Sequence, residues 1–425
     1  MTSAQRRRRV LELAIIGILL AVYLIRFVLP ILTEHGTPRA DDFHDYLNAA
    51  HQIASGQDPY ADFIRTHVPW DWSLNSGYIY PPVFAAMLIP FTWLSMDTAV
   101  RLWLILIQLM VLASLIVVYR GIGRPTRAEL LGVTAVTTSF FPLAANVWTG
   151  AMNTVSLLLL TLAWAAWRRR RDGLAGGLIG FAAIVKIFPV ALLPYLAWRR
   201  HARLCLAMIA TGMVGIGLCF LVTTVDHNLY YFRVLLPHLS TGTGYRENQS
   251  LAGMAARLCD PSTSEHGGAA GWCGRIVTWP AVAGVVALVL VATRRTTRVG
   301  LEFGLAVCAL PLLSTVTWSF HLVLLLFPIA LLIREVVRGT VTRGQRRLLL
   351  VAWGCFALAP LVHYALILDP ITVSPGPAQA LLSAVSTVFA DAYFVGTCLL
   401  FGVLWVTVKR LHRAEASAAV ESLAA

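Results

Sequence analysis

Three carboxylates lie close together in a chain that is otherwise mostly apolar. Asp41, Asp42 and Asp45 fall within DDFHDYLNAAHQIASGQDPY, residues 41–60. A carboxylate beside an apolar environment can act as a general base, because desolvation raises its pKa towards the working pH. A structural role is also open for Asp41 and Asp42, since carboxylates at the start of a helix cap its free backbone N–H groups. The sequence leaves open which of the three would do chemistry.

The same stretch is expected to form an amphipathic helix just outside a first membrane-spanning run. Apolar residues recur at three- and four-residue spacing, while His44, Asp45, Asn48 and their polar neighbours take the other face. Gly56 marks the predicted end of this helix. The apolar face is predicted to consist of Phe43, Tyr46, Leu47, Ala50, Ile53 and Ala54.

Two further polar residues stand out because they interrupt apolar sequence. Lys186 lies in GFAAIVKIFPVALLPY and is one of only two lysines among 34 basic residues. An ammonium there could bind phosphate, although a lysine whose stem reaches the membrane surface is the alternative. His321 ends STVTWSFH, where it could bind a phosphate oxygen or be an ordinary hydrogen-bonded histidine. In the same motif Trp318 is typical of a membrane-interface aromatic residue.

The remaining candidate binding residues lie in polar turns and loops. Asn153 follows WTGAM and could either bind substrate or cap the next helix. Arg246 and Asn248 belong to RENQS, which offers a cation and amides suited to hydroxyls or phosphate. Tyr80, before two prolines, offers a flat face suited to a sugar, with a membrane-interface role equally open.

Composition places the chain in a membrane. It has 425 residues, of which 58% are apolar and 13% charged, and runs of about 18 apolar residues can cross roughly 30 Å of hydrocarbon. We predict an all-α polytopic membrane protein, with residues 1–425 as a single integral membrane domain of about twelve membrane segments. The segment 174–198 is expected to be a short helix pair broken near Lys186, and residues 82–95 are expected to dip in and return. The other predicted spans are residues 10–31, 98–119, 129–146, 153–167, 204–224, 277–293, 299–317, 321–333, 347–368 and 383–408.

Arginine placement predicts the orientation. Clusters such as Arg6 to Arg9 and Arg168 to Arg171 fall on one side of the predicted bundle, and the positive-inside rule makes that side the cytoplasm. Both termini, including a short tail of about residues 409–425, are then cytoplasmic, and polar outer loops of about residues 32–81 and 225–276 face the opposite side. The net charge of +13 is explained by topology, so we predict no nucleic-acid partner.

Cysteine and metal-ligand patterns add little chemistry. Cys259 and Cys273 share the second outer loop and could form a disulfide or remain free thiols. No His, Cys, Asp or Glu cluster has metal-ligand spacing, and no nucleotide-binding motif is present, so we expect no metal and no cofactor.

Six segments, taken in chain order, carry a resemblance to a known family. They are DFHDYLNAAHQIASGQDPY, YIYPPVFAAMLIPFTWL, GAMNTVSLLLL, AGGLIGFAAIVKIFPVALLPYLAWRR, NQSLAGMAARL and STVTWSFHLVLLL. This series resembles bacterial family 87 glycosyltransferases, GT-C type membrane enzymes that include actinobacterial polyprenol-phosphate-mannose-dependent α-(1→2)-mannosyltransferases. The resemblance covers about residues 40–335.

The resemblance implies a GT-C-like bundle and roles for particular residues. Asp42 before Phe43 matches the family's catalytic base, and Lys186 before an apolar residue, an aromatic and a proline matches its lysine. The family often has a proline after the serine and a pair of histidines where this chain has Thr315 and Phe320. The implied catalytic residues are Asp42 and His321, and the implied substrate-binding residues are Asp41, His44, Asp45, Tyr46, Tyr80, Asn153, Lys186, Arg246, Asn248 and Trp318.

The implied function is sugar transfer at the outer face of the bacterial cytoplasmic membrane. A hexose, most simply mannose, would pass from a polyprenyl-phosphate donor to a hydroxyl of a glycolipid or lipoglycan acceptor, with inversion. Two alternatives stay open: the same chemistry with a polyprenyl-phosphate arabinose or glucose donor, or a lipid or solute transporter without enzymatic activity. A transporter would be expected to show internal repeats, and we find none in the sequence.

Overall fold

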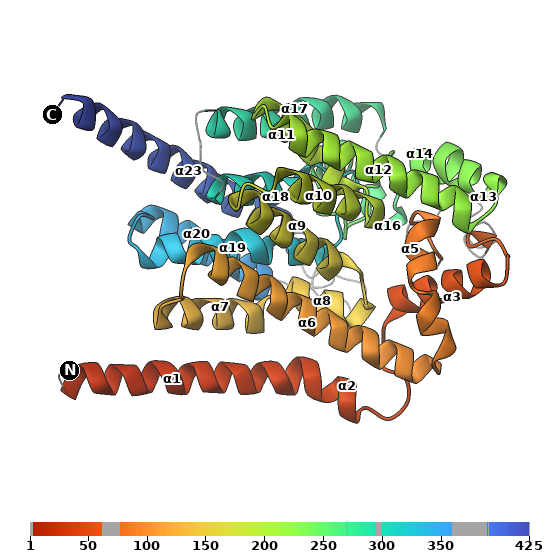
Figure 1. Cartoon of the computed structure of the whole chain (residues 1–425), viewed down its shortest axis with the longest axis horizontal. Helices are drawn as coiled ribbons and strands as arrows, with labels where there is room; N and C mark the ends of the chain where they lie inside the picture. The colour runs from red at the N-terminus through yellow and green to blue at the C-terminus, as the bar shows by residue number, and fades with distance from the viewer. Residues whose placement is uncertain are drawn as a thin grey trace, which may run out of the picture.

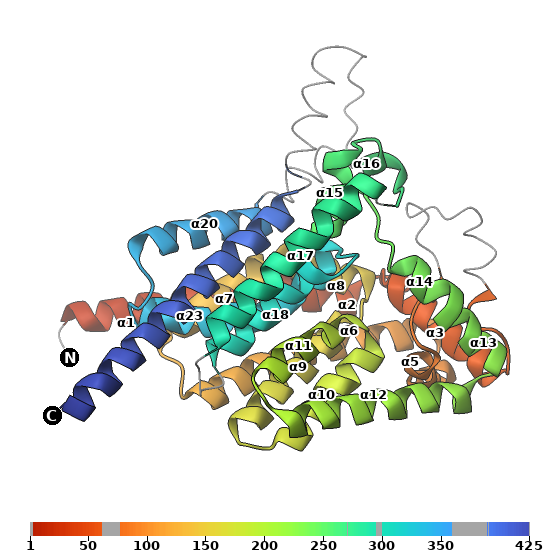
Figure 2. The same cartoon turned by 90° about the horizontal axis from the view of Figure 1, so that it is seen from above.

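The chain folds into helices. The computed structural model describes residues 3–61, 77–269, 271–294, 300–358, 389 and 391–424, and every regular element within them is a helix. This confirms the all-α prediction. Both marked chain ends lie at one end of the molecule, and the short helices α3, α5 and α13 gather at the other (Figure 1; Figure 2).

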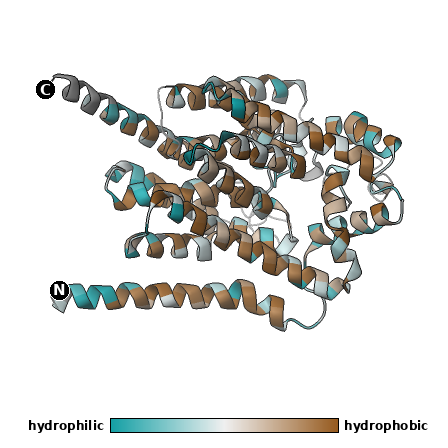
Figure 3. Ribbon diagram, in the orientation of Figure 1, coloured by the Kyte–Doolittle hydropathy of each residue, from teal (hydrophilic) through white to brown (hydrophobic). Residues whose placement is uncertain are grey.

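Among the residues that the structure describes, six helices are long and apolar enough to cross a membrane. Hydrophobic residues cover most of the lengths of α1 and α6, whereas hydrophilic residues gather at the N-terminal end of α1 (Figure 3). α7 (Arg127–Ser139) and α8 (Phe141–Thr149) form a pair bent by 50° that could be a seventh span. The six are α1 with η1 and α2 (Ser3–Tyr23, Leu24–Val28, Leu29–Thr33), α6 (Met96–Ile122), α12 (Ala202–Val222), α17 (Trp272–Thr293), η5 with α19 (Ser319–Leu325, Leu326–Val337) and α23 (Ala392–Ala424).

The predicted total of about twelve membrane segments is not confirmed. Within the described residues, α18 (Leu301–Leu313) has 13 residues, about 20 Å at 1.5 Å per residue, which is too short to cross alone. α9 (Asn153–Arg168) and α20 (Arg343–Ala357) are also short. Much of the predicted span 347–368 and the beginning of 383–408 lie outside the described residues.

A broken helix carries Lys186, as the prolines predicted. α10 (Asp172–Val185) ends at Lys186, which has an extended backbone, and η3 (Phe188–Leu192) and α11 (Leu193–Trp198) follow. α10 packs so closely on α12 that a Cβ at Gly176 would lie 2.2 Å from the Leu204 carbonyl oxygen. This close packing fixes α10, the helix that leads to Lys186, against α12.

Short helices cover the end of the bundle that carries the predicted site. The segment 82–95 forms two helices of six and five residues, neither long enough to cross a bilayer. The disulfide left open by the sequence is present, and Cys259–Cys273 joins α15 to α17. The short elements are α3 (Asp41–Ala54), α5 (Pro82–Met87), η2 (Ile89–Trp93), α13 (Val225–Tyr230), η4 (Tyr231–Leu235), α14 (Leu236–Leu239), α15 (Leu251–Cys259) and α16 (Thr263–His266).

The amphipathic helix predicted from residue 41 is α3, with two corrections. Its predicted apolar face is buried except for Ala54, which is exposed because it lies in the last turn. Asp41 and Asp42 lie in the first turn, at the helix start as expected, but the N-cap residue itself is Ala40, which has no side-chain cap. Gly56 follows the helix end with φ +69°, as predicted.

α3 is fixed against α6 and the turn after α8. Phe43 stacks on Trp103 at 4.9 Å between ring centroids, and the Trp103 indole N–H donates to the Gly150 carbonyl at 2.7 Å. Gly150 has φ +67°, and a Cβ there would lie 2.9 Å from the Ala40 Cβ. The absence of a side chain at Gly150 therefore lets the start of α3, and with it Asp42, approach this turn.

Gly150→Ala is expected to displace α3 and to destabilise the protein by about 2–4 kcal/mol, combining left-handed backbone strain with overpacking. Gly56→Ala is the matched control: its φ of +69° is nearly the same, but nothing lies within 4 Å of its Cβ position. It should cost only about 1–2 kcal/mol. Thermal unfolding of the two purified variants would test this, and equal losses would show that contact with α3 does not matter.

Candidate active site

Lys186 is the centre of a polar cluster contributed by three elements. Its Nζ atom donates to Asn153 Oδ1 at 2.9 Å and lies 2.7 Å from His321 Nε2. Lys186 comes from the break after α10, Asn153 from the first turn of α9 and His321 from η5. The structure thus brings together three residues that the sequence singled out separately.

The contact between Lys186 and His321 limits their combined charge. An imidazolium and an ammonium 2.7 Å apart would repel strongly in a partly buried site, so the two groups are not charged at the same time. The other ring nitrogen, Nδ1, lies 3.2 Å from the Trp318 backbone N–H. Nδ1 accepts from that N–H, so His321 is held by its own helix turn with Nε2 directed at Lys186.

A chain of amides fixes the orientation of Asn153. Asn146, which is fully buried, donates from Nδ2 to the Ala151 carbonyl at 3.0 Å, so its Oδ1 is left to accept from Asn153 Nδ2 at 3.1 Å. Asn153 must then present its own Oδ1 to Lys186. Asn146 was not among the predicted site residues, and its only signal was its position just before WTGAMN.

Asp42 lies on α3 beside this cation. Burial is the main cause that raises the pKa of Asp42, to about 7; Lys186 lowers it, and the neighbouring Asp45 raises it. The Tyr46 hydroxyl lies 3.4 Å from Asp42 Oδ2 and donates towards it. A carboxylate with a pKa near neutrality is suited to accept a proton at the pH of the cell.

Tyr80 lies between Tyr46 and Lys186. Its ring packs edge-on against Tyr46 at 5.4 Å between centroids, and the Lys186 ammonium lies 5.6 Å from its centroid. Two tyrosine hydroxyls hold the backbone of this segment: Tyr60 donates to the Tyr80 carbonyl at 2.9 Å, and Tyr78 donates to the Pro81 carbonyl at 2.6 Å. Sequence reasoning did not assign these positioning roles, because long-range partners of a hydroxyl leave no local pattern.

The other predicted residues of α3 have different surroundings. Asp41 is exposed and pairs with Arg39 at 2.9 Å. Asp45 accepts from the Gly77 backbone N–H at 2.9 Å, which ties α3 to the segment that leads to Tyr80. His44 has a buried Nε2 atom without a hydrogen-bond partner in the described structure. For Asp42, an electrostatic interaction with Lys186 lowers the pKa, which links this carboxylate to the cluster.

Asn248 has no hydrogen-bonding capacity left for a substrate. Its Nδ2 donates to the carbonyls of Thr243 and Thr315 at 2.7 and 3.0 Å, and its Oδ1 accepts from the backbone N–H groups of Ser250 and Thr317 at 3.2 and 2.9 Å. With both donors and both lone pairs in use, Asn248 joins the RENQS loop to the loop that precedes His321. Gln249 continues this junction, and its backbone N–H donates to Thr317 at 2.7 Å.

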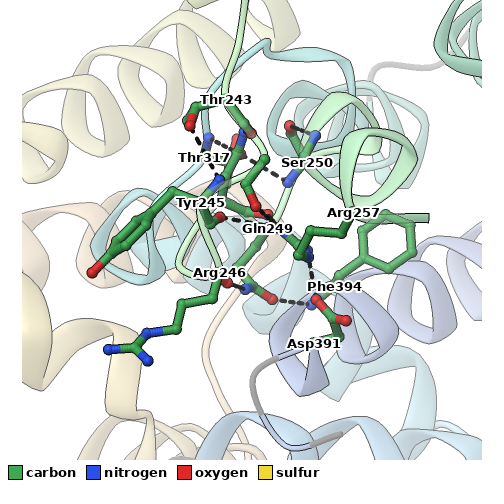
Figure 4. A network of polar contacts seen from close by, with 12 residues as sticks. Thr243, Tyr245, Arg246, Gln249, Ser250, Arg257, Thr317, Asp391 and Phe394 are labelled. Atoms are coloured by element: carbon green, nitrogen blue, oxygen red, sulfur yellow. Dashed lines mark hydrogen bonds and ion pairs between the residues drawn. The ribbon is translucent and has the colours of Figure 1, made fainter. Parts of the chain in front are cut away.

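Arg246 points away from that junction (Figure 4). Its guanidinium lies 5.9 Å from the Tyr245 ring, which in turn packs edge-on against Trp318 at 6.1 Å. Arg257, by contrast, lies inside the junction and pairs with Asp391 at 2.5 Å (Figure 4). The predicted residues Arg246 and Trp318 therefore belong to an aromatic and cationic surface next to the His321 turn.

The described residues contain no group of three His, Cys, Asp or Glu side chains placed to hold a metal ion. What they do contain is the Asp42 carboxylate, whose pKa is raised, in electrostatic contact with the Lys186 amine. Such a pair can remove a proton from one part of a substrate while stabilising negative charge on another.

Comparison with known proteins gives consistent matches. A model of glycosyltransferase family 87 matches residues 78–315, more than half of the chain. The chain is similar to the polyprenol-phosphate-mannose-dependent alpha-(1-2)-phosphatidylinositol mannoside mannosyltransferase of Mycobacterium tuberculosis, with 29% identity over 312 residues, 68% of this chain and 69% of that one. The protein of the same name from Mycolicibacterium smegmatis is 27% identical over 61% of this chain and 60% of its own.

Similarity to solved structures is weaker. ArnT from Cupriavidus metallidurans bound to undecaprenyl phosphate aligns over 96% of this chain and 79% of its own, with a TM-score of 0.44 and 13% identity. A TM-score this low does not establish a shared fold. Asp42, Trp318 and His321 lie outside the matched residues 78–315, so their roles are inferred from the geometry described above.

Asn146→Ala is expected to lower the turnover rate roughly ten- to a hundredfold, because a buried amide left without its partner costs about 1–3 kcal/mol and frees Asn153 to turn. Thr149→Val is the matched control in the same helix, since its hydroxyl bonds only within α8, to the Ala145 and Asn146 carbonyls. Activity and thermal unfolding of both purified variants would be measured. Full activity of Asn146→Ala would show that the hydrogen bond from Asn146 to Asn153 is not needed for activity.

Proposed function

The chain belongs to glycosyltransferase family 87, and from this membership we propose that it is a membrane mannosyltransferase that uses a polyprenyl-phosphate mannose donor. The names of its relatives support mannose and the lipid phosphate. The observation that carries the proposed mechanism is the placement of Asp42 opposite the cation of Lys186, which His321 and Asn153 hold in place.

The proposed reaction is a single displacement at the anomeric carbon. The acceptor hydroxyl oxygen attacks that carbon while the Asp42 carboxylate takes the hydroxyl proton. The bond from the anomeric carbon to the phosphate oxygen breaks, and its electron pair leaves with polyprenyl phosphate. One inversion converts a β-linked donor into an α-linked product, and only one carboxylate is needed, unlike the pair used in glycoside hydrolysis.

The leaving phosphate is the group that Lys186 would stabilise. Polyprenyl phosphate is already stable as an anion, so the site needs a fixed positive charge more than an acid. The Lys186 ammonium supplies that charge as a compact point donor. Asn153 and His321 hold it in place before substrate arrives, so that no reorganisation is needed during the reaction.

We assign the site to the outer face of the membrane, with a glycolipid or lipoglycan as acceptor. The arginine clusters near both chain ends favour a cytoplasmic location for that end of the molecule, and the short helices around Asp42 lie at the opposite end (Figure 1). The names of the relatives support a phosphatidylinositol mannoside as acceptor.

The proposed function is tested with purified protein, a panel of polyprenyl-phosphate sugars and a radiolabelled mannoside acceptor. Transfer from the mannose donor is expected to be fastest. Faster transfer from the arabinose or glucose donor would change the sugar but keep the chemistry. Uptake or flipping in vesicles without any transfer would show a transporter instead.

Asp42→Asn is expected to abolish transfer, since an amide of the same shape cannot accept the proton; losses of 10²–10⁴-fold are typical for a general base. Asp41→Asn is the matched control, because Asp41 is its neighbour but is exposed and paired with Arg39. The control should keep near-normal activity. Wild-type transfer by Asp42→Asn, with unchanged thermal unfolding, would show that another group takes the proton.

The pH profile follows from the raised pKa of Asp42. A general base works only when ionised, so kcat/KM should fall about tenfold per pH unit below a midpoint near 7, the pKa of Asp42. Asp45→Asn removes a negative charge that raises this pKa, and should move the acid limb to lower pH. A fall of kcat/KM centred near pH 4 would contradict the assignment of Asp42 as the base. So would a midpoint that Asp45→Asn leaves unchanged.

A further inference from the structure

A groove of about 970 Å³ runs between α1, α6 and α7, away from the site. We call it the α1 groove. Its walls are almost wholly apolar, with Leu24 from α1, Leu109, Leu112 and Ile116 from α6, and Leu130 from α7. All three helices belong to spans or a bent pair long enough to cross a membrane, so the groove faces lipid.

Polar contacts hold α1 beside the groove at a fixed position. The Tyr23 hydroxyl bonds to the Gln108 side chain, Arg26 donates to the Thr138 carbonyl at 3.4 Å, and the Thr138 hydroxyl donates to the Leu19 carbonyl at 3.3 Å. Apart from such contacts α1 is mostly exposed: only 11% of its apolar, potentially membrane-crossing stretch is buried inside the protein. These hydrogen bonds therefore hold α1 in a fixed position relative to α6 and α7, on either side of the groove.

One end of the groove carries positive charge and an unsatisfied hydroxyl. Arg120 and Arg124 line this end, and both are exposed without a hydrogen-bond or ion-pair partner in the described structure. Tyr119, buried beside Arg120, also lines the groove, and its hydroxyl has no hydrogen-bond partner. Buried polar atoms without partners call for a group that satisfies them.

We propose that the α1 groove binds an anionic diacyl phospholipid, with its phosphate at Arg120 and Arg124 and its acyl chains along the apolar wall. Basic residues at the mouth of an apolar groove between membrane helices are suited to an anionic lipid headgroup. Tyr119 adjoins Arg120 in the chain and lines the same groove.

This occupant is distinct from the sugar donor. Trp103, which contacts α3 through Phe43, and Arg120 are 17 residues apart on α6, about 25 Å along the helix axis. A phosphate at Arg120 therefore lies far from Lys186, across most of the membrane thickness. The inference does not depend on the proposed function and would hold whatever reaction the site performs.

Native mass spectrometry of the purified full-length protein would test this, with added phosphatidylglycerol or phosphatidylcholine as the probe lipid. We expect phosphatidylglycerol to bind more tightly than phosphatidylcholine. The double variant Arg120→Ala, Arg124→Ala should bind it roughly twenty-fold more weakly. The double variant Arg343→Ala, Arg347→Ala loses the same charge at exposed positions of α20, which does not line the groove, and should bind as the wild type does.

Leu112→Trp tests the groove itself without changing charge. Leu112 is 54% exposed and lines the groove, so the larger side chain should fill the space of an acyl chain and weaken phosphatidylglycerol binding. Sugar transfer should stay unchanged in all three variants. Equal binding of the two lipids, or equal binding by all variants, would overturn the proposal, and so would selective retention of polyprenyl phosphate in the groove.

Discussion

The structure of the site depends on holding one ammonium, that of Lys186, in a mostly apolar protein. A cation away from bulk water needs partners, or its burial costs several kcal/mol. Asn153 and His321 are those partners, and they come from the first turns of α9 and η5. The break after α10, the amide chain from Asn146 and the turn that holds His321 all serve to place this group.

The sequence predicted well those features that depend on local pattern. The periodicity of residues 41–54 predicted α3 and nearly all of its buried face, because one helix face recurs every three to four residues. Pro189 predicted the break beside Lys186, since a proline removes a backbone donor wherever it falls. The apolar runs predicted membrane helices but not their number, because α18 is apolar and yet too short to cross alone.

What the sequence could not predict depends on which distant segments meet. Lys186 and His321 are 135 residues apart, so the sequence around one residue gives no sign that the other is its partner. Asn248 has the chemistry of a sugar-binding amide, yet four backbone groups from two loops occupy it completely. The sequence did not single out Asn146 and Tyr60, because each acts by orienting a partner. Asn146 orients Asn153, and Tyr60 holds the Tyr80 carbonyl.

In the proposed mechanism a base and a cation act on the same substrate, which raises a physical conflict that the aromatic residues resolve. If Asp42 touched Lys186, the ion pair would lower the pKa of Asp42 and weaken it as a base. No direct ion pair joins the two in the described structure; the Tyr80 ring packs on Tyr46, which bonds to Asp42, and also lies beside the Lys186 ammonium. Burial therefore outweighs the attraction of the cation, and the pKa of Asp42 stays raised to about 7. In the proposed mechanism the tyrosines around Asp42 therefore keep the proton acceptor and the positive charge near enough to act on one substrate, yet far enough apart that no ion pair lowers the pKa of Asp42.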